Sequence, residues 1–324
     1  MNNTGIENGN GVLTVESDYS KSIKFWVILV GQVFSVPCYF FVIYQFLSRR
    51  ILYSCLHNHV VIVSLILNLI IIGLNVTFHL IYIRTGTILP STPGTCLLWQ
   101  YLDYGFWFGD LYLKFWAAVE RHILIFHSNM MNNRFHRILF HYIPLSFFTL
   151  YCPVVYLYLI FFYSTDFPYD YNVLLCAGPA YYVGIPTWLV WYESLVHYVI
   201  PIFMILLFAM ALPIRVFIQK ARLHLNTSWR QYRKMTIQLL SIAAVYVFDL
   251  PYVLVTIIRW SGFPDFGVEL QGPYFYYCNY IPNLLFPWAI IGSIPNLKNQ
   301  IRQLLACRTP RRQTTIVPHT ATQR

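Results

Sequence analysis

The sequence predicts an all-α membrane protein, a seven-transmembrane helix bundle followed by a short amphipathic eighth helix. Hydrophobic residues make up 57% of the 324 positions and charged residues only 10%, whereas soluble domains are about a quarter charged. A membrane helix needs about 20 apolar residues to cross the hydrocarbon core. Seven stretches are long enough, at residues 24–47, 57–83, 96–127, 138–163, 194–220, 231–259 and 273–294. Apolar residues run through them without the alternation of a barrel strand, which favours helices.

The distribution of charge gives the expected orientation of these spans. Segments that follow the first, third, fifth and seventh spans hold 17 of the 22 lysine and arginine residues, against one acid, Glu120. Basic loops stay on the cytoplasmic side of a membrane, so these segments are expected inside and the N-terminus outside. The net charge of +10 is therefore assigned to topology and to lipid headgroups rather than to nucleic acid. We expect a multi-pass protein of the plasma membrane.

The two tails complete the expected organisation. Residues 1–23 are predicted to be an extracellular N-terminal tail, 24–294 the seven-transmembrane domain, and 295–324 the amphipathic helix and cytoplasmic C-terminal tail. The first 20 residues lack the apolar core of a signal peptide, so the first span is expected to direct membrane insertion. The sequence Asn2-Asn3-Thr4 makes Asn2 a candidate glycosylation site.

An interfacial helix is predicted after the seventh span. Leu297, Ile301, Leu304 and Leu305 fall on one helical face, and the basic residues of the segment lie off it. A helix with this pattern lies in the plane of the membrane surface. Cys307 follows closely and is a candidate for palmitoylation.

The third span carries the most informative side chains. Asp103, Asp110, Lys114 and Arg121 are spaced 7, 4 and 7 residues apart and so share one helix face. An ionisable side chain at membrane depth costs about 2.5 to 3.5 kcal/mol unless it faces protein or water and finds a partner. Asp110 and Lys114 are one turn apart and can pair. We expect this polar core to include Asn68, which the second span places at the same depth.

The expected topology also separates the seven cysteines. Cys96 lies at the outer mouth of the third span, and Cys176 is the only cysteine of the outer segment 164–193. These two can form a disulfide in an oxidising compartment.

Several motifs fall at recognisable positions. Cys96 precedes Glu120-Arg121-His122, with the cysteine at one mouth of the span and the triplet at the other. Other motif positions are Asn58 and Asn68 in the second span, Pro201 in the fifth, Phe248-Asp249-Leu250-Pro251 in the sixth and Phe286-Pro287-Trp288 in the seventh. In these features the chain resembles rhodopsin-like (class A) G protein-coupled receptors from its first span through residue 307, as a divergent orphan branch. His122 stands for the family's tyrosine, and Asn68 for its sodium-site aspartate.

The resemblance implies a receptor that converts binding of an extracellular ligand into activation of a heterotrimeric G protein. It implies that Glu120 and Arg121 hold the resting state, and that Arg121 meets the G protein when the sixth span swings outward. A ligand that binds the open form better would shift this equilibrium. The residues assigned to coupling and switching are Glu120, Arg121, His122, Asp249, Pro251 and Pro287. The prolines are expected hinges because each removes a backbone donor in mid-helix.

Two hypotheses concern the acids of the third span. In the first, the Lys114 ammonium replaces the family's sodium ion as the partner of Asp110 and also reaches Asp249; the alternative is a fixed ion pair that only aids folding. In the second, Asp103 holds a ligand, because it lies where biogenic amine receptors hold the ligand's ammonium group.

The rings of Trp99, Tyr104 and Trp107 could add cation–π contacts at Asp103. A small amine and a basic or amidated peptide are both compatible with this position, and an aspartate that only links helices through water is the third alternative.

Other function classes find less support. A seven-span transporter or a non-signalling decoy receptor is the alternative function, but no internal repeat suggests transport. No enzyme is predicted, because the chain has no Gly-rich phosphate loop, nucleophile elbow or paired catalytic carboxylates. No metal or cofactor is predicted either. His57, His59, His136 and His141 lie in or beside cytoplasmic loops without an acid nearby in the sequence, and the seventh span has no lysine for retinal.

Overall fold

The computed structural model describes residues 17–127, 131, 133–163, 168–179, 187–223 and 229–292. Within these residues all regular structure is helical and no strand occurs, which confirms the predicted all-α class. Asn2, Cys307 and the expected eighth helix lie outside the described residues, as does most of each predicted tail. The first helix begins at Asp18, earlier than the predicted residue 24, because the Ser17 hydroxyl caps it by accepting the Ser20 N–H at 3.3 Å.

Five helices of the described part are long and apolar enough to cross a membrane. They are Asp18–Ser48, Leu56–Thr85, Arg134–Phe162, Trp188–Ile218 and Thr236–Trp260. These correspond to the first, second, fourth, fifth and sixth stretches of the sequence analysis. The helical class is therefore confirmed, and five of the seven predicted spans correspond to helices that are long and apolar enough to cross a membrane.

Most of these five helices consist of consecutive segments with α-helical, π-helical or 3₁₀ winding. The first part contains α1 (Asp18–Ser48), α2 (Arg50–Tyr53), α3 (Leu56–Ile70), η1 (Ile71–Asn75) and α4 (Val76–Thr85). The middle contains α7 (Arg134–Arg137), η4 (Ile138–Tyr142), α8 (Ile143–Leu157), η5 (Tyr158–Phe162) and η6 (Leu174–Ala177). Then follow α9 (Thr187–Tyr192), η8 (Glu193–Val199), α10 (Ile200–Leu223), α11 (Trp229–Val245), η9 (Tyr246–Asp249) and α12 (Leu250–Trp260). Here η1, η4, η5 and η8 are π-helical turns, and η6 and η9 are 3₁₀ turns.

The third predicted span is one uninterrupted helical run. It consists of α5 (Pro93–Tyr101), the π-helical η2 (Leu102–Phe106) and α6 (Trp107–Phe126). This run is not among the five helices that are long and apolar enough to cross a membrane, because it carries charged residues such as Asp103, Asp110 and Lys114. Its α5 end starts with Thr92, whose side chain caps the Thr95 N–H at 3.3 Å.

The seventh predicted span is divided into shorter pieces. These are α13 (Val268–Leu270), η10 (Gln271–Phe275), α14 (Tyr276–Cys278) and α15 (Ile281–Ile291). A turn at 279–280 separates the last two. Pro282 explains the interruption, because it has no N–H to donate to the Cys278 carbonyl one turn earlier.

A second proline in α15 is compensated from α1. Pro287 cannot donate to the carbonyl of Asn283, and the Tyr39 hydroxyl donates to that carbonyl instead at 2.5 Å. The Ser35 hydroxyl likewise donates to the Leu284 carbonyl at 2.6 Å. The proline therefore leaves no unpaired carbonyl at Asn283, and the site of the missing bond becomes a contact between α1 and α15.

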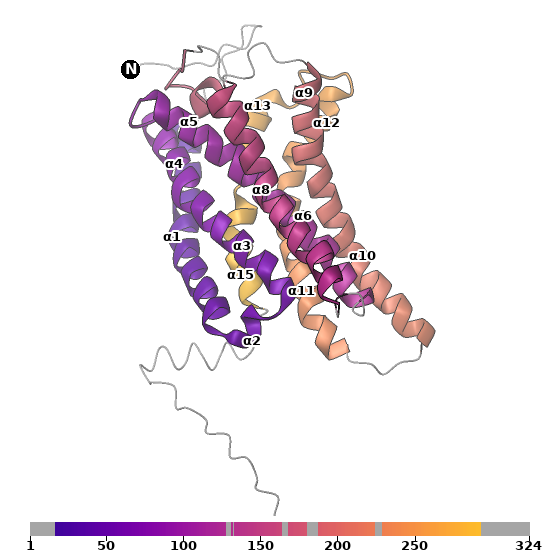
Figure 1. The fold of residues 1–324 in the computed structure, drawn as a ribbon. Coiled ribbons are helices and arrows are strands. Elements are labelled where there is room, and N and C mark those ends of the chain that lie inside the picture. The colour runs from indigo at the N-terminus through magenta and orange to yellow at the C-terminus, as the bar shows by residue number, and fades with distance from the viewer. Residues whose placement is uncertain are drawn as a thin grey trace, which may run out of the picture.

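The run α5–η2–α6 lies in the interior of the helix assembly. α6 packs against α3, α8 and α10, while α15 packs against α1 and α11. α5, α9 and α13 lie at one end of the assembly, and α2 lies at the opposite end with the facing ends of α10 and α11 (Figure 1). We call these the α5 end and the α2 end.

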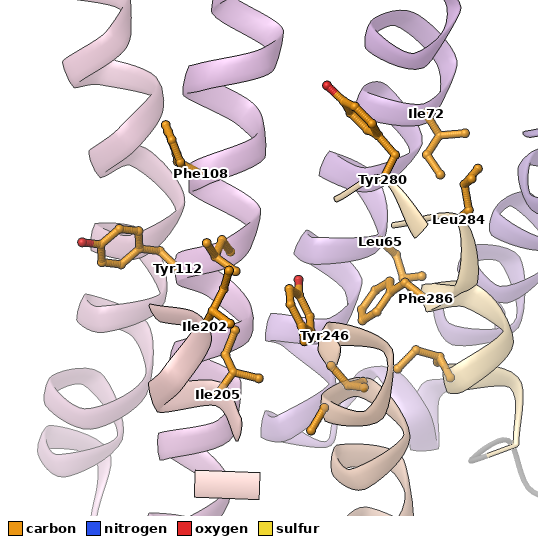
Figure 2. Packing of buried hydrophobic residues seen from close by; sticks show 14 of the residues in the cluster. Leu65, Ile72, Phe108, Tyr112, Ile202, Ile205, Tyr246, Tyr280, Leu284 and Phe286 are labelled. Atoms are coloured by element: carbon orange, nitrogen blue, oxygen red, sulfur yellow. The ribbon is translucent and has the colours of Figure 1, made fainter. Parts of the chain in front are cut away.

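Burial is distributed as in a protein surrounded by lipid. Large apolar side chains such as Phe34, Phe162 and Phe217 are exposed, whereas charged side chains of α6 are buried. Soluble proteins rarely expose such large apolar areas. The interior still has a packed apolar core, of which Figure 2 shows the part that includes Tyr112, Tyr246 and Phe286.

Candidate functional site

A disulfide anchors the α5 end of the central run. Cys96 of α5 is bonded to Cys176 of η6, with their Cα atoms 5.8 Å apart, which confirms the predicted pair. Both cysteines are fully buried. The Gln100 amide strengthens the junction by donating to the carbonyls of Leu175 and Gly178, each at 2.9 Å. The segment around Cys176 is therefore held across the helix that carries Asp103.

Asp103 is surrounded by hydrogen-bond donors from two other helices. The Asn75 amide donates to Asp103 Oδ1 at 2.9 Å, and the Tyr276 hydroxyl donates to Oδ2 at 2.9 Å. The Tyr280 hydroxyl also donates to Oδ1, and His79 Nε2 lies 3.5 Å from the same oxygen. The Asp103 side chain is 11% exposed. Three uncharged donors, the Asn75 amide and the Tyr276 and Tyr280 hydroxyls, thus hold its carboxylate.

The aromatic residues predicted around Asp103 lie in different places. Trp99 is fully buried beside the disulfide, and its Nε1 donates to His79 Nε2 at 3.3 Å. Tyr104 packs against the ring of Tyr156, with centroids 5.7 Å apart. Trp107 packs against Tyr198, with centroids 5.5 Å apart. The rings therefore do not form one cage around the carboxylate.

The partners of Asp103 were missed in the sequence analysis, although a signal was present. Asn75 and His79 are four residues apart in one span, and Tyr276 and Tyr280 are four residues apart in another. Each pair therefore lies on one helix face. Pairs of polar residues at this spacing inside apolar stretches could have been selected as candidates.

The polar core forms as predicted between Asp110, Lys114 and Asn68. Lys114 Nζ donates to Asp110 Oδ2 at 2.5 Å. Asp110 Oδ1 accepts from the Asn68 amide at 2.6 Å and from the Ser64 hydroxyl at 2.5 Å. Both charged side chains are 2% exposed. This carboxylate therefore has an ammonium partner, and its charge is neutralised inside the protein.

Lys114 also links α6 to the helix that contains Pro287. Its Nζ donates to Asn283 Oδ1 at 3.2 Å and to Asn68 Oδ1 at 3.4 Å. It lies 4.3 Å from the centroid of the Phe286 ring and 5.4 Å from that of Tyr246, distances suited to cation–π contact. An ammonium group has three donors, and all three have acceptors here.

Asp249 is the exception among the buried acids. It ends the 3₁₀ turn η9, directly before the proline-containing start of α12, and it is fully buried. Neither of its oxygens has a hydrogen-bond partner in the described part of the chain. Lys114 is close enough to interact with it electrostatically, but no hydrogen bond joins them. The predicted reach of Lys114 to Asp249 is therefore absent from this structure.

The start of α12 has the geometry expected of a hinge. Pro251 occupies its first turn, and the preceding η9 has tighter 3₁₀ winding. A short 3₁₀ stretch inside a longer helix often marks a bend or hinge. The two halves of this span therefore meet next to the Asp249 carboxylate.

At the α2 end, Glu120 has a partner that the sequence analysis did not identify. Its carboxylate is bonded to His141 Nδ1 of η4, and the two side chains are 1% and 0% exposed. The prediction that no acid lies near His141 is therefore wrong. Glu120 is distant from His141 in the sequence but contacts it in the fold. Arg121 is fully buried and interacts electrostatically with Glu120, so it does not extend to solvent.

His122 joins α6 to α10 with one consistent tautomer. Its Nε2 donates to the Phe208 carbonyl at 2.8 Å, and its Nδ1 accepts from Arg215 at 3.4 Å. The Arg215 guanidinium in turn lies 4.3 Å from the centroid of the Phe126 ring. His122 thus fixes the contact between these two helices.

The interior of the site has little free space. A cavity of about 10 Å³, lined by Ser64, Lys114 and Phe286 among others, lies beside the polar core; it is about the size of one water molecule. Within the described ranges, no group of three His, Cys, Asp or Glu side chains is placed to hold a metal ion. The side chains described above can take part in hydrogen bonding, ion pairing and proton transfer.

No family model matches the chain, and no curated protein matches it.

The acids of the run α5–η2–α6 each have a different kind of partner. One helical run carries three acids, of which Asp103 is bonded to neutral donors, Asp110 to an ammonium group and Glu120 to an imidazole.

Proposed function

We propose that the protein is a plasma-membrane receptor of the rhodopsin-like type, which converts binding of an extracellular amine or peptide into activation of a heterotrimeric G protein. In this proposal the α5 end is extracellular and the α2 end cytoplasmic. The run α5–η2–α6 and the segment α13–α15 would be the third and seventh spans, beside the five apolar helices. The basic residues near the α2 end support this orientation.

One observation carries the proposal. A single helical run bears a disulfide at the α5 end, a buried ion pair in its middle, and buried Glu120 and Arg121 at the α2 end. A buried arginine has a large desolvation cost, and a position near the α2 end lets it become accessible if neighbouring helices separate. That combination suits a protein in which an event at one end exposes a group at the other.

Asp103 is the proposed ligand contact. Tyr276 and Tyr280 hold its carboxylate with hydroxyl groups, and an incoming ammonium group would form a stronger, charge-assisted bond. Replacing these hydroxyls would release α14 and the 279–280 turn from the third span. The ligand would therefore act by breaking contacts between the third and seventh spans.

Lys114 and Asp249 are the proposed transmission step. If α12 pivots at Pro251, the Asp249 carboxylate shifts relative to α6, and among the described residues it is the buried acid near Lys114 that lacks a hydrogen-bond partner. Lys114 could then exchange Asp110 for Asp249. The fixed ion pair remains the alternative, and it requires that signalling be unaffected when Lys114 is replaced in a protein that reaches the cell surface.

The proposal is tested by G protein activation in cells that express the wild type, Arg121→Ala or Arg50→Ala at matched surface levels. Arg50 is an exposed arginine of α2 at the same end, so it controls for loss of a positive charge. We expect a response to one member of a panel of amines and amidated peptides in the wild type and in Arg50→Ala, and none in Arg121→Ala.

A second variant separates the ligand site from the coupling site. Asp103→Asn should raise the concentration of ligand needed for half-maximal response by at least tenfold, which corresponds to about 1.4 kcal/mol. Specific ligand binding without any G protein response would instead favour a decoy receptor. Saturable uptake of a ligand into cells would favour the transporter.

A further inference from the structure

Three side chains at the α2 end form a linear hydrogen-bonded chain that the proposed receptor function does not use. His59 Nε2 bonds to the backbone carbonyl of Tyr53 at 2.8 Å, and His59 Nδ1 lies 3.0 Å from His141 Nε2. His141 Nδ1 is bonded to the Glu120 carboxylate. The chain thus runs from α2 through α3 and η4 to α6.

The first bond fixes one proton position. A backbone carbonyl can only accept, so His59 Nε2 must carry a hydrogen. If His59 is neutral, its Nδ1 is then an acceptor, and His141 Nε2 must donate to it. If His59 is charged, its Nδ1 donates, and His141 Nε2 accepts.

The last bond fixes the proton count. With neutral His59, His141 has used its Nε2 hydrogen, so either His141 is charged and donates to the Glu120 carboxylate, or a protonated Glu120 donates to it. With charged His59, a neutral His141 donates from Nδ1 to the carboxylate. Each arrangement that makes all three bonds contains one proton more than two neutral imidazoles and a carboxylate.

We infer that Glu120, His141 and His59 form a proton-binding site, buried at Glu120 and His141, in which a single bound proton joins α6 to η4 and α3. Loss of the proton would leave a lone pair facing the carboxylate or two imidazole lone pairs facing each other. One bond of the chain would then be replaced by repulsion between buried atoms. The inference goes beyond the proposed receptor function and does not depend on it.

Charged and aromatic groups surround the chain on each of its elements. On α6, Arg121 interacts electrostatically with Glu120. On α3, His57 interacts electrostatically with both His59 and Arg121. On η4, the Tyr142 ring packs against His141, with centroids 4.7 Å apart, and on α2 the Tyr53 ring lies 5.7 Å from His59. These groups surround the three side chains on all four elements, and the Glu120 carboxylate is the group that a proton on His141 would face.

The site makes the fold sensitive to pH in a defined direction. Above about pH 7 the unfolded chain has neutral imidazoles and an ionised Glu120, so folding takes up one proton at this site. The ratio of unfolded to folded protein is then expected to rise about tenfold for each pH unit while the folded site keeps its proton. Near pH 6.5 the two imidazoles of the unfolded chain together bind about one proton, as many as the folded site, so the contribution of the site is independent of pH there.

The decisive experiment counts the proton in the purified full-length protein. The protein is labelled with ¹⁵N-histidine, reconstituted in nanodiscs at pH 8 and compared with Glu120→Gln by solid-state NMR and infrared spectroscopy. The side-chain amide introduced by this substitution can donate to His141 Nδ1, which completes the chain with two neutral histidines. We expect the wild type to show either one imidazolium among its ten histidines or one carboxylic acid band, and Glu120→Gln to lack that feature.

Two further variants serve as controls for the spectra. Glu269→Gln makes the same chemical change at an exposed acid and should retain the wild-type spectrum, while His141→Gln assigns the histidine resonance. A wild-type spectrum in which all histidines are neutral and no carboxylic acid band is lost in Glu120→Gln would overturn the inference. If Glu120→Gln does not fold, the wild-type count is made by comparison with His59→Asn, which keeps an acceptor near the position of Nδ1.

A second measurement follows the same proton through stability. Thermal unfolding in nanodiscs between pH 7 and pH 9 should show the wild type losing stability relative to Glu120→Gln as pH rises. Parallel curves for the two proteins would contradict a proton bound at this site over that range.

Discussion

Asp103 and Asp110 lie two turns apart on one helical run, yet their surroundings differ in kind. Asp103 is held by hydroxyl and amide donors from neighbouring helices and keeps 11% of its side chain exposed. Asp110 is 2% exposed and is bonded to Lys114, an ammonium group of its own helix. The Asp103 carboxylate can exchange a neutral partner for a cation. The Asp110 carboxylate already has a cationic partner, Lys114, which belongs to the same helix.

The same residue type, an aspartate, therefore has two different properties in one helical run. Neutral donors satisfy a carboxylate but do not cancel its charge, so Asp103 remains attractive to a cation that reaches it. The Lys114 ammonium cancels the charge of Asp110, so this carboxylate does not attract a second cation. In the proposed receptor, the partners of a carboxylate rather than its position in the helix would therefore decide whether it binds a ligand.

The largest effect on stability is expected when the cationic partner of Asp110 is removed. Lys114→Met leaves Asp110 buried without a charged partner, and we expect a loss of about 3 to 5 kcal/mol in the free energy of unfolding. Unfolding of purified protein in mixed micelles measures this. Lys21→Met is the control, because Lys21 forms an exposed ion pair with Asp18 at 4.0 Å, and its loss should cost less than about 1 kcal/mol. Equal effects of the two changes would contradict the role assigned to Lys114.

A smaller effect is expected when Asp103 loses a neutral donor. Tyr280→Phe removes one hydrogen bond to the carboxylate and should lower the free energy of unfolding by about 1.5 to 3 kcal/mol. The same unfolding measurement applies, with Tyr274→Phe as the control, because Tyr274 lies on the same segment and is 42% exposed. If Tyr280→Phe destabilised the protein as much as Lys114→Met, the contrast between exchangeable and tethered partners would be lost.

The smallest effect is expected at Asp249. Among the described residues it has no hydrogen-bond partner to lose, so Asp249→Asn should change the free energy of unfolding by about 1 kcal/mol or less. Any proposed role of Asp249 in transmission would then appear as reduced ligand-stimulated signalling at normal stability. Destabilisation comparable to that of Lys114→Met would show that Lys114 depends on Asp249 in the resting protein.

The sequence was sufficient for features that lie along one helix or that chemistry forces together. The spacing of Asp110 and Lys114 places them on one face whatever the rest of the fold does, and the pairing of Cys96 with Cys176 follows from their expected side of the membrane. The apolar helices follow from composition in the same way. These predictions need no knowledge of how the helices are rotated.

Contacts between helices could not be predicted in this way. Asn75 and Tyr280 meet at Asp103, and His141 meets Glu120, only because each helix has a particular rotation about its axis. The spacing of polar residues marks one face of each helix, but it does not indicate which neighbouring helix that face meets. The interruption at 279–280 was also missed, because the apolar stretch continues through Pro282 without a change in composition.

The claim that Lys114 is the dedicated partner of Asp110 is tested most directly by a double-mutant cycle. The free energy of unfolding is measured for the wild type, Asp110→Asn, Lys114→Met and the double variant. We expect the double variant to be more stable than the sum of the single losses implies, with a coupling energy of about 2 to 3 kcal/mol. Single losses that simply add would contradict a tethered pair, and with it the distinction between Asp110 and Asp103.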